Sequence, residues 1–117
     1  MEILSSDQLI AKKCEVCETG TDPYSVKHSQ QQLDNLPGWE LGDDQKNIFK
    51  TFTFSNFLQG LEFCNQVGAI AEEDQHHPDL HLTGYRNVRV EMTTHSIGGL
   101  SENDFILAAK IDSIEPS

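Results

Sequence analysis

Residues 55 to 74 constrain the fold most, because their apolar side chains recur at three- and four-residue spacing. This spacing is typical of an amphipathic helix with one buried stripe. Ser55 or Asn56 can cap its start, and Pro78 forbids any helix much beyond His76. The residues predicted to form the buried stripe are Phe57, Leu61, Cys64, Val67 and Ala71, widened by Leu58 and Ile70.

Helices and hairpins alternate along the rest of the chain. A first helix is predicted over residues 25–36, where "PG" stops it, and a β-hairpin follows over 39–54. Residues 80–83 and 88–95 predict a second hairpin, because Val88, Val90 and Met92 alternate with polar residues. Two hairpins that flank a long helix indicate a mostly antiparallel sheet.

The last helix is predicted over residues 101–112, where Ser101 and Asp104 match the S-x-x-D capping pattern. The order is therefore α-β-β-α-β-β-α. It predicts an α+β fold, with a four-stranded antiparallel sheet and helices packed on one face. We expect residues 1–24 to be an irregular lead-in and residues 25–117 to form a single domain.

Length and charge narrow the class of protein. The chain has 117 residues, which suits one compact domain, and a net charge of −11 from 19 acids against 8 Lys plus Arg. Nucleic acids and anionic membranes attract cationic surfaces, so neither is an expected partner. No apolar run approaches the roughly 20 residues of a membrane span, and residues 1–6 do not resemble a secretory signal. We therefore expect a soluble, cytosolic protein.

The cysteines do not form a recognisable framework. There are three, Cys14, Cys17 and Cys64, and an odd number without a secretory signal argues against a disulfide scaffold. Cys14 and Cys17 form a CxxC, but no second pair completes a structural zinc site. We expect this CxxC to lie in a solvated N-terminal segment and to bind no metal.

Three histidines are expected to converge. His76 and His77 leave the end of the long helix, where Pro78 fixes the backbone, and His95 ends the fourth strand. In the second hairpin, the end of one strand lies beside the start of the other. His95 is thereby brought close to the histidine pair at one edge of the sheet.

Such a cluster has several possible roles. Three imidazoles can bind zinc. They can also act as general acids and bases, because an unperturbed imidazole titrates around pH 6.5. Alternatively, the histidines cap the end of a helix and stabilise its dipole. The two remaining histidines, His28 and His81, are expected at the surface.

Two acids accompany the histidines, and each has two interpretations. Asp104 either closes the capping box of the last helix or orients His95 from across the glycine loop. Glu72 lies one helical turn before His76 on the same face, or else it is a solvated acid at a helix end. The sequence alone leaves both pairs of alternatives open.

The ordered set of motifs around these residues resembles a known family. From Glu72 the chain reads E-x-x-x-H-H-P, and then come Tyr85, "TTH" at 93–95, "GGLSENDF" and "LAAKID". This order is similar to that of the pterin-4a-carbinolamine dehydratase family. The upstream "LPGWEL", the Phe-rich strand and "NQVGAIAE" also resemble it, so the likeness covers about residues 25–112.

The resemblance implies both a reaction and a mode of assembly. Family members dehydrate 4a-hydroxytetrahydropterin to quinonoid dihydropterin, which recycles the cofactor of aromatic amino acid hydroxylases. They need no metal and no bound cofactor, and they form dimers or tetramers. Their four-stranded antiparallel sheet with helices on one face agrees with the order predicted above.

The resemblance also suggests roles for particular residues. The candidate catalytic residues are His76, His77 and His95, and the supporting residues are Glu72, Pro78, Thr94 and Asp104. We expect His76 and His95 to transfer protons and His77 to bind and orient the pterin. The alternative function is that of a non-catalytic binding protein, such as a dimerisation partner of a transcription factor.

Overall fold

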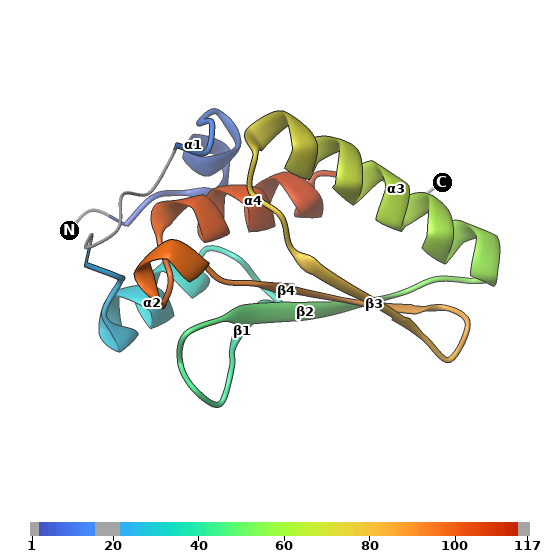
Figure 1. Cartoon of the computed structure of the whole chain (residues 1–117), viewed down its shortest axis with the longest axis horizontal. Helices are drawn as coiled ribbons and strands as arrows, with labels where there is room; N and C mark the ends of the chain where they lie inside the picture. Colours follow the sequence, from blue (N-terminus) through green and yellow to red (C-terminus); the bar gives the residue numbers. More distant parts are fainter. Residues whose placement is uncertain (1–2, 16–21, 115–117) are drawn as a thin grey trace.

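The computed structural model describes residues 3–15 and 22–114 and shows the expected α+β architecture (Figure 1). Its elements are α1 (Ser6–Ile10), α2 (Val26–Leu33), β1 (Glu40–Leu41), β2 (Ile48–Thr53), α3 (Phe57–Asp74), β3 (Asp79–Thr83), β4 (Asn87–Met92), a 3₁₀ turn η1 (His95–Ile97) and α4 (Glu102–Asp112). The sheet has the order β1-β2-β4-β3, and every pairing in it is antiparallel. The predicted fold class is confirmed.

The sheet buries one face under the two long helices. Along β4, Val88, Val90 and Met92 are buried and the intervening residues are only partly covered, as the period of two requires. Figure 1 shows α3 and α4 on the same side of the sheet. The core therefore lies between β4 and these helices.

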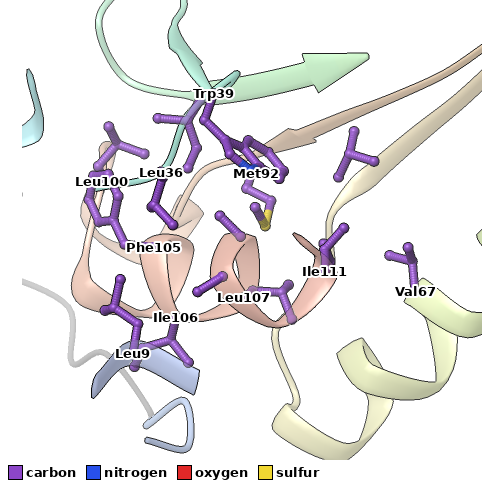
Figure 2. Close-up of a cluster of buried hydrophobic side chains, with 14 of the residues drawn as sticks. Leu9, Leu36, Trp39, Val67, Met92, Leu100, Phe105, Ile106, Leu107 and Ile111 are labelled. Atoms are coloured by element: carbon purple, nitrogen blue, oxygen red, sulfur yellow. The ribbon is translucent and has the colours of Figure 1, made fainter. Parts of the chain in front are cut away.

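Helix α4 is the centre of the core. Most of its residues are buried, and Figure 2 shows side chains from α1, the α2–β1 connection and the sheet packed around it. Asp74 at the end of α3 accepts a hydrogen bond from Lys110 of α4 at 2.6 Å. Because Asp74 is buried, this ion pair fixes the end of α3 against α4.

The predicted buried stripe of α3 is wrong in its first two turns. Phe57, Leu58 and Leu61 are exposed, and we call them the apolar patch. Gly60 faces the sheet instead, and a Cβ built on it would lie 3.1 Å from Cδ1 of Leu82. The absent side chain lets the helix approach β3 and β4 closely at this point. The buried residues of α3 are Gly60, Phe63, Val67, Ala71 and Asp74.

The expectation of an irregular lead-in over residues 1–24 missed α1. Ser5 and Gln8 form a complete capping box around its first turn, and Leu9 is fully buried among the residues of α4. The side chain of Gln32 also makes two hydrogen bonds to the backbone of Leu4. Its Oε1 accepts from the Leu4 N–H at 2.9 Å, and its Nε2 donates to the Leu4 carbonyl at 2.7 Å. The N-terminal segment, residues 3–15, is thus packed onto the domain.

We predict that α1 contributes directly to the stability of the domain. Leu9→Ala should lower the free energy of unfolding in urea by about 2–5 kcal/mol, because it leaves a cavity in the core. Ile10→Ala, at a side chain that is 38% exposed, is the matched control and should change it by only about 0.5 kcal/mol. Equal losses in the two variants would contradict the packing of α1.

Candidate active site

A residue in the left-handed backbone conformation ends α3 just before the histidine pair. Gln75 has φ 54° and ψ 39°, and its N–H donates to the carbonyls of Ala71 and Glu72. The next N–H, that of His76, also donates to Ala71, at 3.1 Å. The helix therefore stops just before His76, and the chain continues through Pro78 into β3.

His76 is held by a buried carboxylate. Its Nε2 lies 2.6 Å from Oδ1 of Asp104, and the two side chains are 12% and 0% exposed. A carboxylate accepts, so Nε2–H donates and the other ring nitrogen, Nδ1, remains for a second contact. Asp104 was expected to act on His95 if on any histidine, but the histidine that it contacts is His76.

The other oxygen of Asp104 holds two further parts of the site. Oδ2 accepts from the hydroxyl of Thr94 at 2.8 Å and from the backbone N–H of Ser101 at 3.0 Å. The Ser101 contact is half of the capping box of α4, which is complete. Asp104 therefore both caps α4 and positions a histidine, with three donors around one buried carboxylate.

His77 has a carboxylate partner in a more open setting. Its Nε2 lies 2.6 Å from Oε1 of Glu72, and the side chains are 57% and 71% exposed. An exposed pair of this kind contributes only about 0–1 kcal/mol to stability, so its effect is to orient the ring. The sequence placed Glu72 on the same helix face as His76, and the histidine that Glu72 contacts is His77.

His95 lies in a turn and not in a strand. β4 ends at Met92, and His95 opens η1, so the prediction that the strand extends to residue 95 is wrong. The reason is that Thr94 turns inward: it is buried, bonds Asp104, and pairs with Gly99 across a tight loop. The His95 side chain is exposed, and within the described residues its ring makes no hydrogen bond.

These groups surround one open pocket of about 370 Å³, which we call the histidine pocket. Its lining residues are Glu15, Gln75, His76, His77, Thr93, Thr94, His95, Ser96 and Asn103. The structure thus places the three candidate catalytic histidines and Thr94 around one space. Glu72, Pro78 and Asp104 do not line the pocket, but Asp104 bonds His76 and Glu72 bonds His77.

A second hollow of about 200 Å³ adjoins the pocket and shares His77, Thr93 and His95 with it. The loop between β1 and β2 supplies its opposite wall, and the hydroxyl of Thr93 donates to the carbonyl of Lys46 at 2.5 Å. Sequence patterns predicted neither this contribution nor that of Glu15 and Asn103. No local pattern could have found them, because they reach the site through contacts distant in sequence.

The two remaining histidines differ in burial. His81 is exposed, as expected, and lies 3.1 Å from Glu91. His28 was expected at the surface but is buried, because its ring stacks on Tyr24 with 3.9 Å between centroids. Tyr24 in turn stacks on Phe105. His28 is therefore part of the core beneath α2.

Cys14 is a structural thiol. Its Sγ donates to the backbone carbonyl of Asn103 at 3.5 Å. Burial raises the pKa of the Cys14 thiol to about 12, and the neighbouring Asp74 carboxylate adds to the rise. The thiol is therefore protonated at neutral pH. Cys17, the second cysteine of the CxxC, lies outside the described residues.

The described residues contain neither a cluster suited to a metal ion nor a helix suited to a membrane. Within residues 3–15 and 22–114, no group of three or more His, Cys, Asp or Glu is arranged to hold a metal ion. Over the same residues, no helix has both the length and the apolar character needed to cross a membrane.

The fold and the pocket define a class: a small α+β domain with carboxylate-held histidines around an open cavity. The family model "Pterin 4 alpha carbinolamine dehydratase" matches residues 22–114. The chain belongs to the pterin-4a-carbinolamine dehydratase family, a family of hydro-lyases.

Individual relatives agree with this membership. A protein assigned as a pterin-4-alpha-carbinolamine dehydratase from Methylococcus capsulatus is 42% identical over 91% of this chain and 92% of its own length. Another, from Nitrosospira multiformis, is 47% identical over 92% of this chain and 93% of its own length. A mitochondrial pterin-4-alpha-carbinolamine dehydratase of Arabidopsis thaliana is 43% identical over 92% of this chain and 59% of its own. The crystal structure of a transcriptional coactivator/pterin dehydratase from Brucella melitensis superposes with a TM-score of 0.73 and 29% identity, over 79% and 97% of the two chains.

The raised pKa of Cys14 predicts slow alkylation. A Cys17→Ser, Cys64→Ser double variant keeps Cys14 as its one cysteine. At pH 8 its folded form should react with iodoacetamide at least about a hundredfold more slowly than its urea-unfolded form, because only the thiolate reacts. Mass spectrometry over time measures both rates. Similar rates in the two forms would contradict the burial of the thiol.

Proposed function

We propose that this protein dehydrates 4a-hydroxytetrahydropterin to quinonoid dihydropterin by histidine acid/base catalysis, in recycling of the pterin cofactor. The observation that carries the proposal is the buried 2.6 Å contact between His76 and Asp104 at the wall of the histidine pocket. Family membership supplies the substrate class, and the pocket supplies the groups that its chemistry needs.

The reaction requires two proton transfers. The C4a–O bond breaks as the N5 electron pair forms a double bond to C4a, and an acid protonates the departing oxygen so that it leaves as water. A base removes the N5 proton. Histidine suits both steps because it exists in both protonation states near neutral pH.

The contacts support a division of roles. Asp104 fixes the His76 ring with Nε2–H toward the carboxylate, which leaves Nδ1 to exchange a proton with the substrate. His95 lines the same pocket and is the proposed second proton-transfer group. His77, oriented by Glu72 and shared by the pocket and the adjoining hollow, binds and orients the pterin.

The supporting residues act on these histidines. Thr94 donates to Asp104, which keeps that carboxylate directed toward His76. Pro78 restricts the backbone directly after His77. Neither residue transfers a proton in this proposal, and no metal or bound cofactor takes part.

A coupled assay tests the proposal. An aromatic amino acid hydroxylase generates the substrate, and absorbance follows quinonoid dihydropterin. We expect the purified protein to accelerate dehydration, and His76→Ala and His95→Ala each to lose about 10²- to 10⁴-fold of that acceleration. His81→Ala is the matched control: His81 lies outside both pockets, so activity should stay within about twofold.

A wild-type protein that is folded but gives no acceleration would refute the proposed reaction. Full activity in both His76→Ala and His95→Ala would leave the reaction standing but remove these residues from it. The same assay probes the suggested link to a hydroxylase, because a faster pterin cycle raises the hydroxylase's steady-state rate.

The apolar patch supports a second part of the proposal, that the protein is a homodimer or homotetramer. Phe57, Leu58 and Leu61 are 48%, 74% and 39% exposed on consecutive turns of α3, and large apolar side chains gathered on a surface favour association. Cytosolic location is proposed as well, and fractionation of the source cells would test it.

We expect Leu58→Lys to lower the molar mass measured by size-exclusion chromatography with light scattering, because it places a charge in the interface. Gln66→Lys, at an exposed position of the same helix, adds the same charge away from the patch and should leave the mass unchanged. A wild-type monomer, or an oligomer indifferent to Leu58→Lys, would contradict this interface.

One relative favours a second candidate function. The Brucella protein is described as a transcriptional coactivator as well as a pterin dehydratase. We therefore keep a binding role toward a transcription factor as the alternative. The two functions separate experimentally, because His76→Ala should lower the rate acceleration about 10²- to 10⁴-fold and leave a binding role intact.

A further inference from the structure

Three consecutive residues in the first turn of α4 bond three residues from two other parts of the chain. Asp104 holds His76, as described above. Glu102 accepts from Nζ of Lys12 at 2.6 Å, and Asn103 binds the backbone of Glu15. The turn that positions a candidate catalytic histidine thus also positions the end of the N-terminal segment.

The contact between Asn103 and Glu15 is a two-point clamp. Oδ1 of Asn103 accepts the Glu15 N–H at 2.9 Å, and Nδ2 donates to the Glu15 carbonyl. Cys14 adds a third contact, through its thiol, to the Asn103 carbonyl. Asn103 is itself buried, so the clamp is partly sheltered from water and fixes the backbone of residue 15.

The clamp places Glu15 at the wall of the histidine pocket. Glu15 and Asn103 both line it together with His76, His77 and His95. Among the described residues that line this pocket, Glu15 is the one carboxylate. The match to the family model begins at residue 22, so Glu15 comes from outside the matched region.

A carboxylate at this wall suits a particular edge of the substrate. A pterin carries a 2-amino group beside a ring N–H, and both are donors that lie in one plane. A carboxylate accepts two parallel hydrogen bonds from such an edge, as it does from a guanidinium.

We propose that Glu15 is a substrate-binding residue of the histidine pocket and that Asn103 is its positioning residue. This inference rests on the proposed function, because it takes the ligand to be a pterin. It adds the N-terminal segment to the site. Substrate affinity then depends on residues that precede the family-matched domain.

The experiment measures KM and kcat separately in the coupled assay. Glu15→Gln and Glu15→Ala should raise KM for the 4a-hydroxytetrahydropterin about ten- to a hundredfold, the loss expected for a charge-assisted hydrogen bond. They should leave kcat within about twofold, which is the signature of lost binding without lost chemistry. Asp7→Asn, an acid of the same segment that lines neither pocket, is the matched control and should change neither constant.

Asn103→Leu tests the clamp. It should raise KM as Glu15→Ala does, and in the Glu15→Ala background it should add no further increase, because it acts through Glu15. Titration calorimetry with a dihydropterin that lacks the C4a hydroxyl should show the same loss of affinity without any turnover. Circular dichroism melting confirms that each variant is folded.

The outcomes separate the two proposals. An active wild type with unchanged KM and dihydropterin affinity in both Glu15 variants would overturn the role of Glu15 and leave the proposed function intact. A fall in kcat at unchanged KM would also overturn it, since Glu15 would then act on chemistry and not on binding. A wild type that neither dehydrates nor binds the pterin overturns both.

Discussion

The buried carboxylate of Asp104 is the interaction on which the site depends. A fully buried charge is costly unless donors surround it, and here the backbone of Ser101, the hydroxyl of Thr94 and the ring of His76 supply them. Each donor comes from a different stretch: the start of α4, the loop after β4 and the end of α3. Satisfying one carboxylate therefore brings together three segments that would otherwise meet only through packing.

The two histidines after α3 show how a short turn creates two environments. The left-handed Gln75 ends the helix, and the two histidines that follow it contact different carboxylates. The His76 ring is nearly buried against Asp104, while the His77 ring is more than half exposed beside Glu72. Identical side chains thus experience different solvation, which is how a site can use similar groups for different purposes.

Local sequence patterns predicted the helices and strands well, because hydrophobic periodicity and capping motifs depend on residues within short stretches. The long helix, both hairpins and the capping box at Ser101 and Asp104 all follow from residues that are near neighbours in sequence. The failed predictions concern features that a distant contact decides.

The exposed side of α3 depends on where Gly60 meets the sheet, and the burial of His28 depends on Tyr24. The partner of Asp104 depends on the turn at Thr94. Glu15 reaches the pocket through Asn103, 88 residues later, and no local pattern encodes such a contact.

Three residues in the first turn of α4 bond distant parts of the chain, and this restricts where the chain can change in length. Consecutive residues of a helix point about 100° apart, so Glu102, Asn103 and Asp104 serve three directions from a single turn. Inserting or deleting one residue within that turn would rotate the later positions relative to their partners and break several contacts at once. The turn between β3 and β4, residues 84–86, lines neither the histidine pocket nor the adjoining hollow and can change in length more freely. Insertions are therefore better tolerated in that turn than at the start of α4.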